Sequence, residues 1–203
     1  MASRDHNLDQ PIIDAAFNEF MEKGYAKASL RNIASNASVT IGAIYTRFKT
    51  KDELFYSLVE PLIKRISEVF ATSKSDYSNV RIDNKEGFLL AMKHESDMIL
   101  HLLFDDYDRA KLLLCKADNS SLSNFFDQLT DLKIEETIKY FKMTKINANR
   151  DVIKLVIKAE FDIYYQMIDG GYKLEEAKVI LDNIMEYHLG GWIRLLETSA
   201  KGE

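Results

Sequence analysis

Apolar residues recur along this chain with the period of an α-helix. In a clear short example, Leu30, Ile33 and Ala34 stand at the i, i+3, i+4 spacing that places side chains on one helix face. β-branched residues nowhere form alternating runs bounded by turn pairs, so no strand is expected. The pattern predicts an all-α protein with about nine helices, a normal number for a chain of 203 residues.

The first helix is expected to end near residue 23, because Gly24 is a typical C-terminal stop. Its buried face is expected to consist of Ile13, Ala16, Phe17 and Phe20. A connector helix opens at Lys51, and Pro61 either bends it or separates two helices. After an expected loop at residues 73–84, further helices are predicted at residues 85–104, 107–116, 122–143, 150–169 and 173–198.

Residues 29–54 are predicted to form two short helices joined by a tight turn, followed by the start of the connector. The helical pattern breaks at residues 36–39, and Thr40 restarts it as an N-cap whose hydroxyl can accept from free N–H groups. Thr50 and Glu53 then have the spacing of a capping box. Helix, short turn and helix make a helix-turn-helix unit, whose second helix can enter the major groove of DNA.

The charge pattern supports such a use of this stretch. The segment from Lys23 to Lys51 contains six basic residues and no Asp or Glu. The chain as a whole carries −5, so the remainder outside this +6 segment carries −11. One basic segment on an acidic body is typical of a protein that presents one face to phosphates, although a merely solvated basic face is the alternative.

The residues that carry a known family pattern are Ile13, Ala16, Phe17, Phe20, Gly24, Tyr25, Ser29, Ile33, Ala34, Ala37, Val39, Thr40, Gly42, Ile44, Tyr45, Phe48 and residues 51–54. With these residues the stretch resembles the DNA-binding domain of the TetR/AcrR family of bacterial transcriptional regulators. Two departures from the family pattern stand out. Ser38 occupies a turn position where the family usually has glycine, so it must accept a positive φ or lie in a shifted turn. Asn32 replaces a common acidic residue.

The resemblance implies a homodimeric DNA-binding regulator, a repressor released from its double-stranded operator by a small-molecule effector. Residues 1–50 would form the helix-turn-helix domain and residues 51–203 the helical effector-binding and dimerisation domain. Ile41 has an alternative place in the core, because it lies three residues before Ile44 on the same helix. The residues expected to bind DNA are Ser29, Arg31, Thr40, Ile41, Gly42, Ala43, Tyr45, Thr46, Arg47 and Lys51.

Two further sites are expected in the C-terminal domain. The candidate effector-pocket residues are Met98, His101, Phe104, Tyr107, Phe125, Glu160 and Tyr164. The candidate dimer-interface residues are Tyr187, Gly190, Gly191, Trp192 and Leu195. Each set has a simpler alternative: aromatic residues at helical spacing are often plain core, and the glycine pair could be a local kink. His94, Asp97 and His101 share one helix face, where a metal site is a weaker possibility.

Other functions find little support in the sequence. There is no nucleophile–base motif, no phosphate loop and no paired-cysteine metal site, so neither an enzyme nor a cofactor is expected. Cys115 is the single cysteine, which fits a reducing cytoplasm, and no apolar run approaches membrane-spanning length. The alternative is an all-α enzyme or small-ligand carrier that uses the helix-turn-helix only for packing. The connector through Pro61 is expected to be the only covalent path from pocket to DNA-binding domain.

Overall fold

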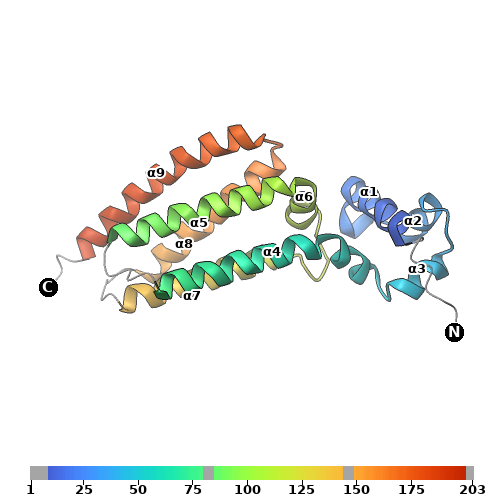
Figure 1. Ribbon diagram of the computed structural model, residues 1–203, viewed down its shortest axis with the longest axis horizontal. Helices are drawn as coiled ribbons and strands as arrows, with labels where there is room; N and C mark the ends of the chain where they lie inside the picture. The colour runs from blue at the N-terminus through green and yellow to red at the C-terminus, as the bar shows by residue number, and fades with distance from the viewer. Residues whose placement is uncertain (1–8, 80–84, 144–148, 200–203) are drawn as a thin grey trace. The chain divides into compact units, whose positions relative to one another are not determined.

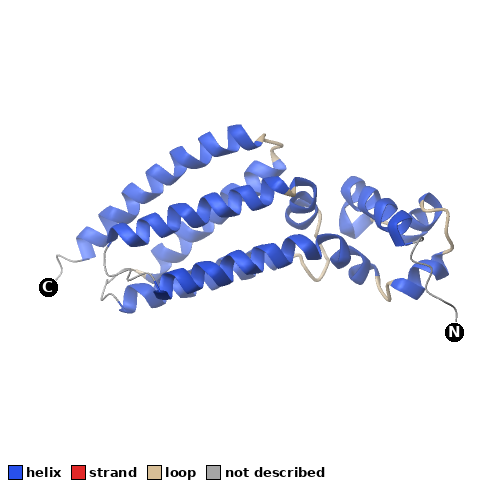
Figure 2. Ribbon diagram, in the orientation of Figure 1, coloured by secondary structure: helices blue, strands red, loops and turns tan. Residues whose placement is uncertain are grey.

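The computed structural model of the protein describes residues 9–79, 85–143 and 149–199. Within these ranges it contains nine α-helices and no strand (Figure 2). The predicted all-α class is therefore confirmed. The helices are α1 (Asp9–Lys27), α2 (Leu30–Asn36), α3 (Ile41–Arg47), α4 (Lys51–Asn79), α5 (Lys85–Asp105), α6 (Tyr107–Cys115), α7 (Phe125–Met143), α8 (Arg150–Asp169) and α9 (Leu174–Ser199).

The chain divides into two compact units, and the division does not fall at residue 50. The first unit combines Met1–Lys64 with Asp106–Asn124, and the second combines Arg65–Asp105 with Phe125–Glu203. The chain passes between the units three times, at residues 64/65, 105/106 and 124/125. Residues 1–50 still join the remainder of the chain only through residue 51. The functional boundary between a DNA-binding and an effector-binding domain stays a prediction.

In the first unit, α1 ends its regular course at Gly24, which has φ 71° and ψ 162°. Its buried face differs from the predicted one, since Ile13 and Phe17 are only half-buried. The helix is rotated so that an acidic residue, Glu19, also points inward. The buried residues of α1 are Ile12, Ala15, Ala16, Glu19 and Phe20.

Aromatic packing fixes α1 against the beginning of α4. The Phe20 and Phe55 rings meet edge to face with centroids 5.0 Å apart, and Tyr25 meets Phe55 at 5.2 Å. Such edge-to-face pairs add stability beyond the area they bury. The Tyr25 N–H donates to the Lys116 carbonyl oxygen at 2.8 Å, which joins this cluster to the segment that follows α6.

The turn between α2 and α3 is a Schellman motif with Ser38 at the left-handed position. Ser38 has φ 55°, its N–H donates to the Ser35 carbonyl, and the Val39 N–H donates to the Ala34 carbonyl. These are the two hydrogen bonds that define the motif. Of the two possibilities left by the sequence, Ser38 thus accepts the positive φ.

We expect Ser38→Gly to raise the free energy of unfolding by about 0.5–1 kcal/mol, because glycine adopts a positive φ without the steric penalty of a side chain. Ser35→Gly is the matched control, since Ser35 lies inside α2 and glycine there is expected to destabilise by about 0.5 kcal/mol. Urea denaturation of both variants measures the two effects. A Ser38→Gly protein less stable than wild type would contradict the strain assigned to Ser38.

The connector α4 is one helix that continues through Pro61. Its N-terminus is capped as predicted: the Thr50 hydroxyl oxygen accepts from the Glu53 N–H at 3.0 Å, and the Glu53 carboxylate accepts from the Lys49 N–H at 2.7 Å. Arg109 of α6 donates through Nε to the Leu58 carbonyl at 2.8 Å, close to the proline. The expected loop from residue 73 is wrong as far as Asn79, which is still helical, and its remainder at residues 80–84 lies outside the described part.

The second unit consists of α5, α7, α8, α9 and the C-terminal part of α4, which run roughly along one another (Figure 1). α7 packs on α8, and α5 packs on α9. Asn149 caps α8, because its side-chain oxygen accepts from the Asp151 N–H at 2.8 Å. Each helix buries one apolar face, and the largest side chain fully buried in this unit is Trp192 of α9.

Candidate nucleic-acid interface

Helix α3 presents part of an apolar face to solvent. Ile44 is 1% exposed and anchors α3 in the core of the first unit, whereas Ile41 is 38% exposed and Tyr45 is 50% exposed. The alternative that placed Ile41 in the core is therefore wrong. Exposed apolar and aromatic side chains on a short helix that follows a tight turn form a surface suited to the edges of DNA bases.

The first turn of α3 is fixed by its own hydrogen bonds. The Thr40 hydroxyl oxygen accepts from the Ala43 N–H at 3.1 Å, and the Thr46 hydroxyl donates to the Gly42 carbonyl at 2.9 Å. A Cβ added to Gly42 would meet within 4 Å only the Thr40 hydroxyl oxygen, at 3.7 Å. Packing within the chain therefore does not require a glycine, although glycine lowers the intrinsic stability of a helix.

Arg47 is placed differently from the sequence prediction, which had it reaching a DNA base or phosphate. Its Nε forms an ion pair with the Asp9 carboxylate, and its Nη1 donates to the Ala43 carbonyl at 3.2 Å. The Arg47 side chain is only 8% exposed. The prediction for Arg47 is corrected accordingly: its guanidinium ties α3 to the start of α1 and is held inside the unit.

Lys51 lies beside α1, at the start of α4. Its Nζ sits 4.6 Å from the centroid of the Tyr25 ring and 3.5 Å from the Ala26 carbonyl oxygen. Burial lowers the pKa of Lys51, and the nearby Glu19 carboxylate acts in the opposite direction. The cation therefore stands on an aromatic face at a helix N-terminus, where an incoming anion would meet both the ammonium group and free N–H groups.

Sequence reasoning did not identify Glu19, which organises the start of α2. Glu19 is 5% exposed, and its carboxylate accepts from the Ser29 N–H at 3.0 Å and from Asn32 Nδ2 at 3.2 Å. Ser29 is half-buried and makes no side-chain cap, while Arg31 is exposed. The bond also explains Asn32: an acidic residue at this position would face the Glu19 carboxylate. The sequence did contain a signal for this role, because Glu19 lies on a face of α1 that is otherwise apolar.

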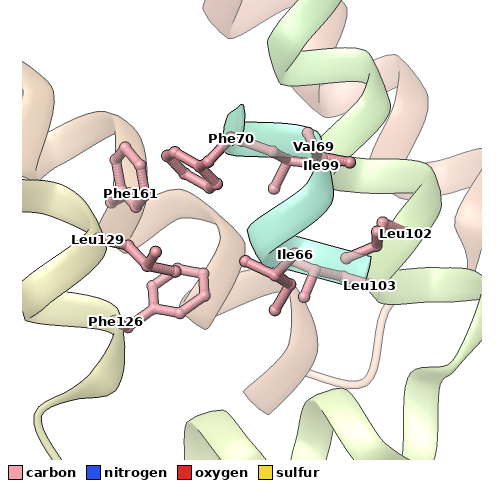
Figure 3. Close-up of a pocket in the computed structure, with 9 residues that line it drawn as sticks. All are labelled: Ile66, Val69, Phe70, Ile99, Leu102, Leu103, Phe126, Leu129 and Phe161. Atoms are coloured by element: carbon pink, nitrogen blue, oxygen red, sulfur yellow. The ribbon is translucent and has the colours of Figure 1, made fainter. Parts of the chain in front are cut away.

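The described part of the second unit contains small cavities and an open groove. An apolar cavity of about 10 Å³ is lined by Ile66, Val69, Phe70, Ile99, Leu102, Leu103, Phe126, Leu129 and Phe161 (Figure 3). A neighbouring cavity of about 20 Å³ has a polar wall and includes Glu160 and Tyr164 in its lining. A groove of about 490 Å³ between α5 and α9 includes His94, Asp97 and His101.

The predicted effector-pocket residues are thus only partly brought together. Glu160 and Tyr164 share a cavity, while His101 lines the separate groove. Met98, Phe104 and Phe125 are half-buried, and Phe126 rather than its neighbour Phe125 lines the apolar cavity. Tyr107 lies in α6, in the first unit. Helical spacing alone could not distinguish Phe125 from Phe126, because adjacent residues point in different directions on a helix.

The predicted dimer-interface residues separate into two groups. Tyr187 is 81% exposed, and a Cβ added to Gly190 or Gly191 would meet nothing within 4 Å. Trp192, in contrast, is 1% exposed, packs edge to face on Phe141 and donates through Nε1 to Glu160 at 3.1 Å. Trp192 is therefore a core residue of its own protomer, which corrects its assignment as an interface anchor. The Leu195 side chain lies outside the described part.

Comparisons with known proteins agree on the type of protein. A family model described as "Bacterial regulatory proteins, tetR family" matches residues 12–58. The chain is 25% identical over 151 residues to the negative transcriptional regulator IcaR of the biofilm operon icaADBC in Staphylococcus epidermidis, covering 74% of this chain and 78% of IcaR. It is 23% identical over 187 residues to the "Probable acrEF/envCD operon repressor" of Escherichia coli K12, covering 87% of this chain and 84% of that protein.

The fold also matches solved structures. The transcriptional regulator FadR from Bacillus subtilis, in complex with stearoyl-CoA, superposes with a TM-score of 0.52 at 19% identity, covering 96% of this chain and 98% of FadR. The repressor MexZ of Pseudomonas aeruginosa superposes with a TM-score of 0.58 at 16% identity, covering 95% of this chain and 96% of MexZ. At 19% and 16% identity, these similarities show a shared fold.

The helix-turn-helix on a basic segment, attached to an all-α body, defines a DNA-binding transcriptional regulator. Residues 12–58 match the TetR family of bacterial regulatory proteins, and relatives named as repressors are similar to most of the chain. The alternative of an all-α enzyme or ligand carrier is set aside, because the family and these relatives are regulators of transcription. Across the described ranges, no helix is both long enough and apolar enough to cross a membrane.

Proposed function

We propose that the protein is a homodimeric repressor that binds a twofold operator through α3 and leaves it when a small molecule binds in the second unit. The observation that carries the proposal is the solvent-exposed face of α3, where Ile41 and Tyr45 are 38% and 50% exposed on a short helix anchored by Ile44. Relatives named as repressors support the sign of the regulation. A bacterial regulator of this kind would act in the cytoplasm.

The proposed contacts follow from the position of each residue. Thr40, Ile41, Gly42 and Ala43 form the first turn of α3 and would face the base edges, with Ile41 and Ala43 against thymine methyl groups. The exposed position of Gly42 would let the backbone come close to the DNA. The remaining proposed contacts go to phosphates, and they come from Ser29, Arg31, Tyr45, Thr46 and Lys51.

Lys51→Ala should weaken binding to every DNA sequence and flatten its dependence on salt, because it removes a phosphate contact rather than a base contact. Tyr45→Phe should act in the same direction if its hydroxyl reaches a phosphate. The measurement is fluorescence anisotropy of a labelled duplex from the region flanking the protein's own gene, over a series of salt concentrations. Lys64→Ala is the control, because Lys64 is an exposed lysine of α4 that is already paired with Glu60. An unchanged salt slope for Lys51→Ala would show that Lys51 does not contact the DNA.

The dimer is proposed to form through the exposed faces of α8 and α9. Gly190 and Gly191 leave open space above α9, and Tyr187 on the same helix is 81% exposed. Leu155 of α8 is 68% exposed as well. Two adjacent glycines weaken a helix. A structural reason to keep them is the close approach of a neighbouring helix. A second copy of the chain, related by a twofold axis, would supply that helix and would match a twofold operator.

The Gly191→Leu variant distinguishes an effect on dimer formation from an effect on the stability of the single chain. Leucine meets nothing in the protomer and favours a helix over glycine, so the protomer should gain up to about 1 kcal/mol of stability. In the dimer the same side chain should hold the two copies apart and increase the dissociation constant. Sedimentation velocity at low micromolar concentration, paired with thermal unfolding, measures both effects. A variant that stays as dimeric as wild type would place the interface elsewhere.

An effector would release the DNA only if it favours one arrangement of the two α3 helices over another. The described cavities of the second unit are the proposed place for it, and one solved relative of this fold holds stearoyl-CoA. That a tilt of α4 around Pro61 couples effector binding to DNA release stays a prediction. Because the chain passes between the units at two further points, Pro61 would be one contributor among several.

A further inference from the structure

The polar wall of the 20 Å³ cavity contains more negative than positive charge. Glu95 of α5 and Lys133 of α7 form an ion pair, and their side chains are 6% and 10% exposed. Glu160 of α8 is 14% exposed and contacts His188 of α9. The formal charges of Glu95, Lys133 and Glu160, which line the cavity, sum to −1. Buried charges are stable only with nearby compensation, so this excess is informative about what the cavity can accept.

Glu160 is the group in this wall with capacity for another partner. Its Oε1 receives both contacts that it makes, from His188 Nδ1 at 2.9 Å and from Trp192 Nε1 at 3.1 Å. Among the described residues, no donor reaches the second carboxylate oxygen, Oε2. An ionised carboxylate can accept about four hydrogen bonds in total. Glu160 is thus positioned by two donors on one oxygen, while the other oxygen can accept more.

The polar cavity is next to the apolar one, because Ile99 and Phe161 line both. The apolar cavity has only hydrocarbon and aromatic side chains around it, which come from α4, α5, α7 and α8 (Figure 3). At about 10 and 20 Å³, each has room for about one water molecule. Phe70 and Phe126 contact Phe161 at this junction, in a tilted and an edge-to-face arrangement, so a ligand larger than water requires these rings to move.

We infer that the two cavities together receive a hydrophobic molecule with a cationic head group, whose charge pairs with Glu160 while its apolar part lies among Ile99, Phe161 and their neighbours. This inference rests on the proposed function, which needs an effector in the second unit. A cation brings the charge of the wall from −1 to zero. It would donate to Glu160 Oε2 without disturbing the bonds that Oε1 already accepts.

The same wall disfavours the opposite head group. An anion would have to compete with Glu95 for Lys133, and it would add a third negative charge beside two buried carboxylates. Tyr164 offers no such anion site, because its hydroxyl donates to the Ser96 carbonyl at 3.3 Å. A neutral molecule of the same length would fill the apolar cavity but would leave Glu160 without a new partner. Cationic, anionic and neutral ligands can therefore be distinguished by the charge of the head group.

The test uses octylamine, octanol and octanoate, which share one chain length and differ in charge at pH 7. Each is titrated into the purified full-length protein, with isothermal calorimetry and the fluorescence of Trp192 as readouts. Trp192 is the single tryptophan of the chain and is bonded to Glu160, so it reports on this site. Octylamine should bind at least about tenfold more tightly than octanoate or octanol, a margin reasonable for a partly buried ion pair. Octanoate binding as tightly as octylamine, or no saturable binding of octylamine, overturns the inference.

The Glu160→Gln variant locates the charge that is recognised. It keeps the side-chain size and an acceptor for Trp192 but removes the negative charge. Octylamine affinity should fall at least about tenfold and octanol affinity should stay the same. Asp131→Asn, an exposed acid on α7, is the control and should change neither. Unchanged octylamine affinity in Glu160→Gln overturns the inference. If the variant does not fold, the order of the three ligands on the wild-type protein still decides.

Failure of this inference and failure of the proposed function are distinguishable. The ligand titrations are done without DNA, so they test the head-group preference alone. DNA release is measured separately by adding each ligand to the protein bound to a labelled operator duplex. If octylamine binds but does not release DNA, the inferred ligand class stands and the proposed effector role is wrong. If octanoate binds more tightly than octylamine and releases DNA, the proposed regulatory function stands and the inferred ligand class is wrong.

Discussion

Trp192→Ala should lower the free energy of unfolding by about 3–5 kcal/mol, the usual range for removing a large aromatic side chain from a packed core. Trp192 is 1% exposed, and its ring meets Phe141 edge to face with centroids 5.7 Å apart. The substitution leaves a cavity on that side. It also removes the Nε1 donor that Glu160 accepts at 3.1 Å, which leaves a nearly buried carboxylate with one bond fewer.

Two further variants divide this loss into its parts. Trp192→Phe keeps most of the apolar contact and removes the hydrogen bond, so it should lose about 1–3 kcal/mol. Ile193→Ala is the matched control, because Ile193 is the next residue of α9 and is 39% exposed. Urea unfolding followed by far-ultraviolet circular dichroism measures all three without relying on tryptophan fluorescence. Trp192→Ala would contradict the assignment if it lost less than about 1 kcal/mol, or if its loss disappeared at high protein concentration, as expected for an interface residue.

The sequence was sufficient for the helices and for the local geometry around the helix-turn-helix. α8 was predicted with its observed bounds, and the caps at Thr40 and Thr50 form as expected. These features depend on residues close together in the chain, whose types carry a direct physical preference. The exposure of Ile41 was expected from the resemblance, since spacing alone also allowed a core position.

What the sequence could not supply depends on long-range contacts. Arg47 is a basic residue on the expected DNA-binding helix, and only its pairing with Asp9, 38 positions earlier, removes it from that surface. Trp192 follows two exposed glycines, and only its contacts with Phe141 and Glu160 place it in the core. The second unit's cavities were equally hidden, because the facing side chains come from four helices far apart in the chain.

Ile41→Glu should abolish sequence-specific DNA binding and leave the fold intact. Ile41 is 38% exposed in the first turn of α3, so a glutamate there can remain in water in the free protein. On DNA, it would replace an apolar base contact with a charge that the phosphates repel. An unfavourable base contact costs about 1–3 kcal/mol, and a dimer would make two, so affinity should fall at least about 30-fold.

The most direct test of the central claim, that the exposed face of α3 binds DNA, is a gel-shift comparison of wild type and Ile41→Glu on the DNA flanking the protein's own gene. Leu90→Glu is the control, because it adds the same charge at a 70% exposed residue of the second unit. Wild type and Leu90→Glu should shift one fragment at similar concentrations, with affinity that falls steeply as salt increases. Ile41→Glu should not shift it at those concentrations. An Ile41→Glu protein that binds the fragment as tightly as wild type would contradict the role assigned to α3.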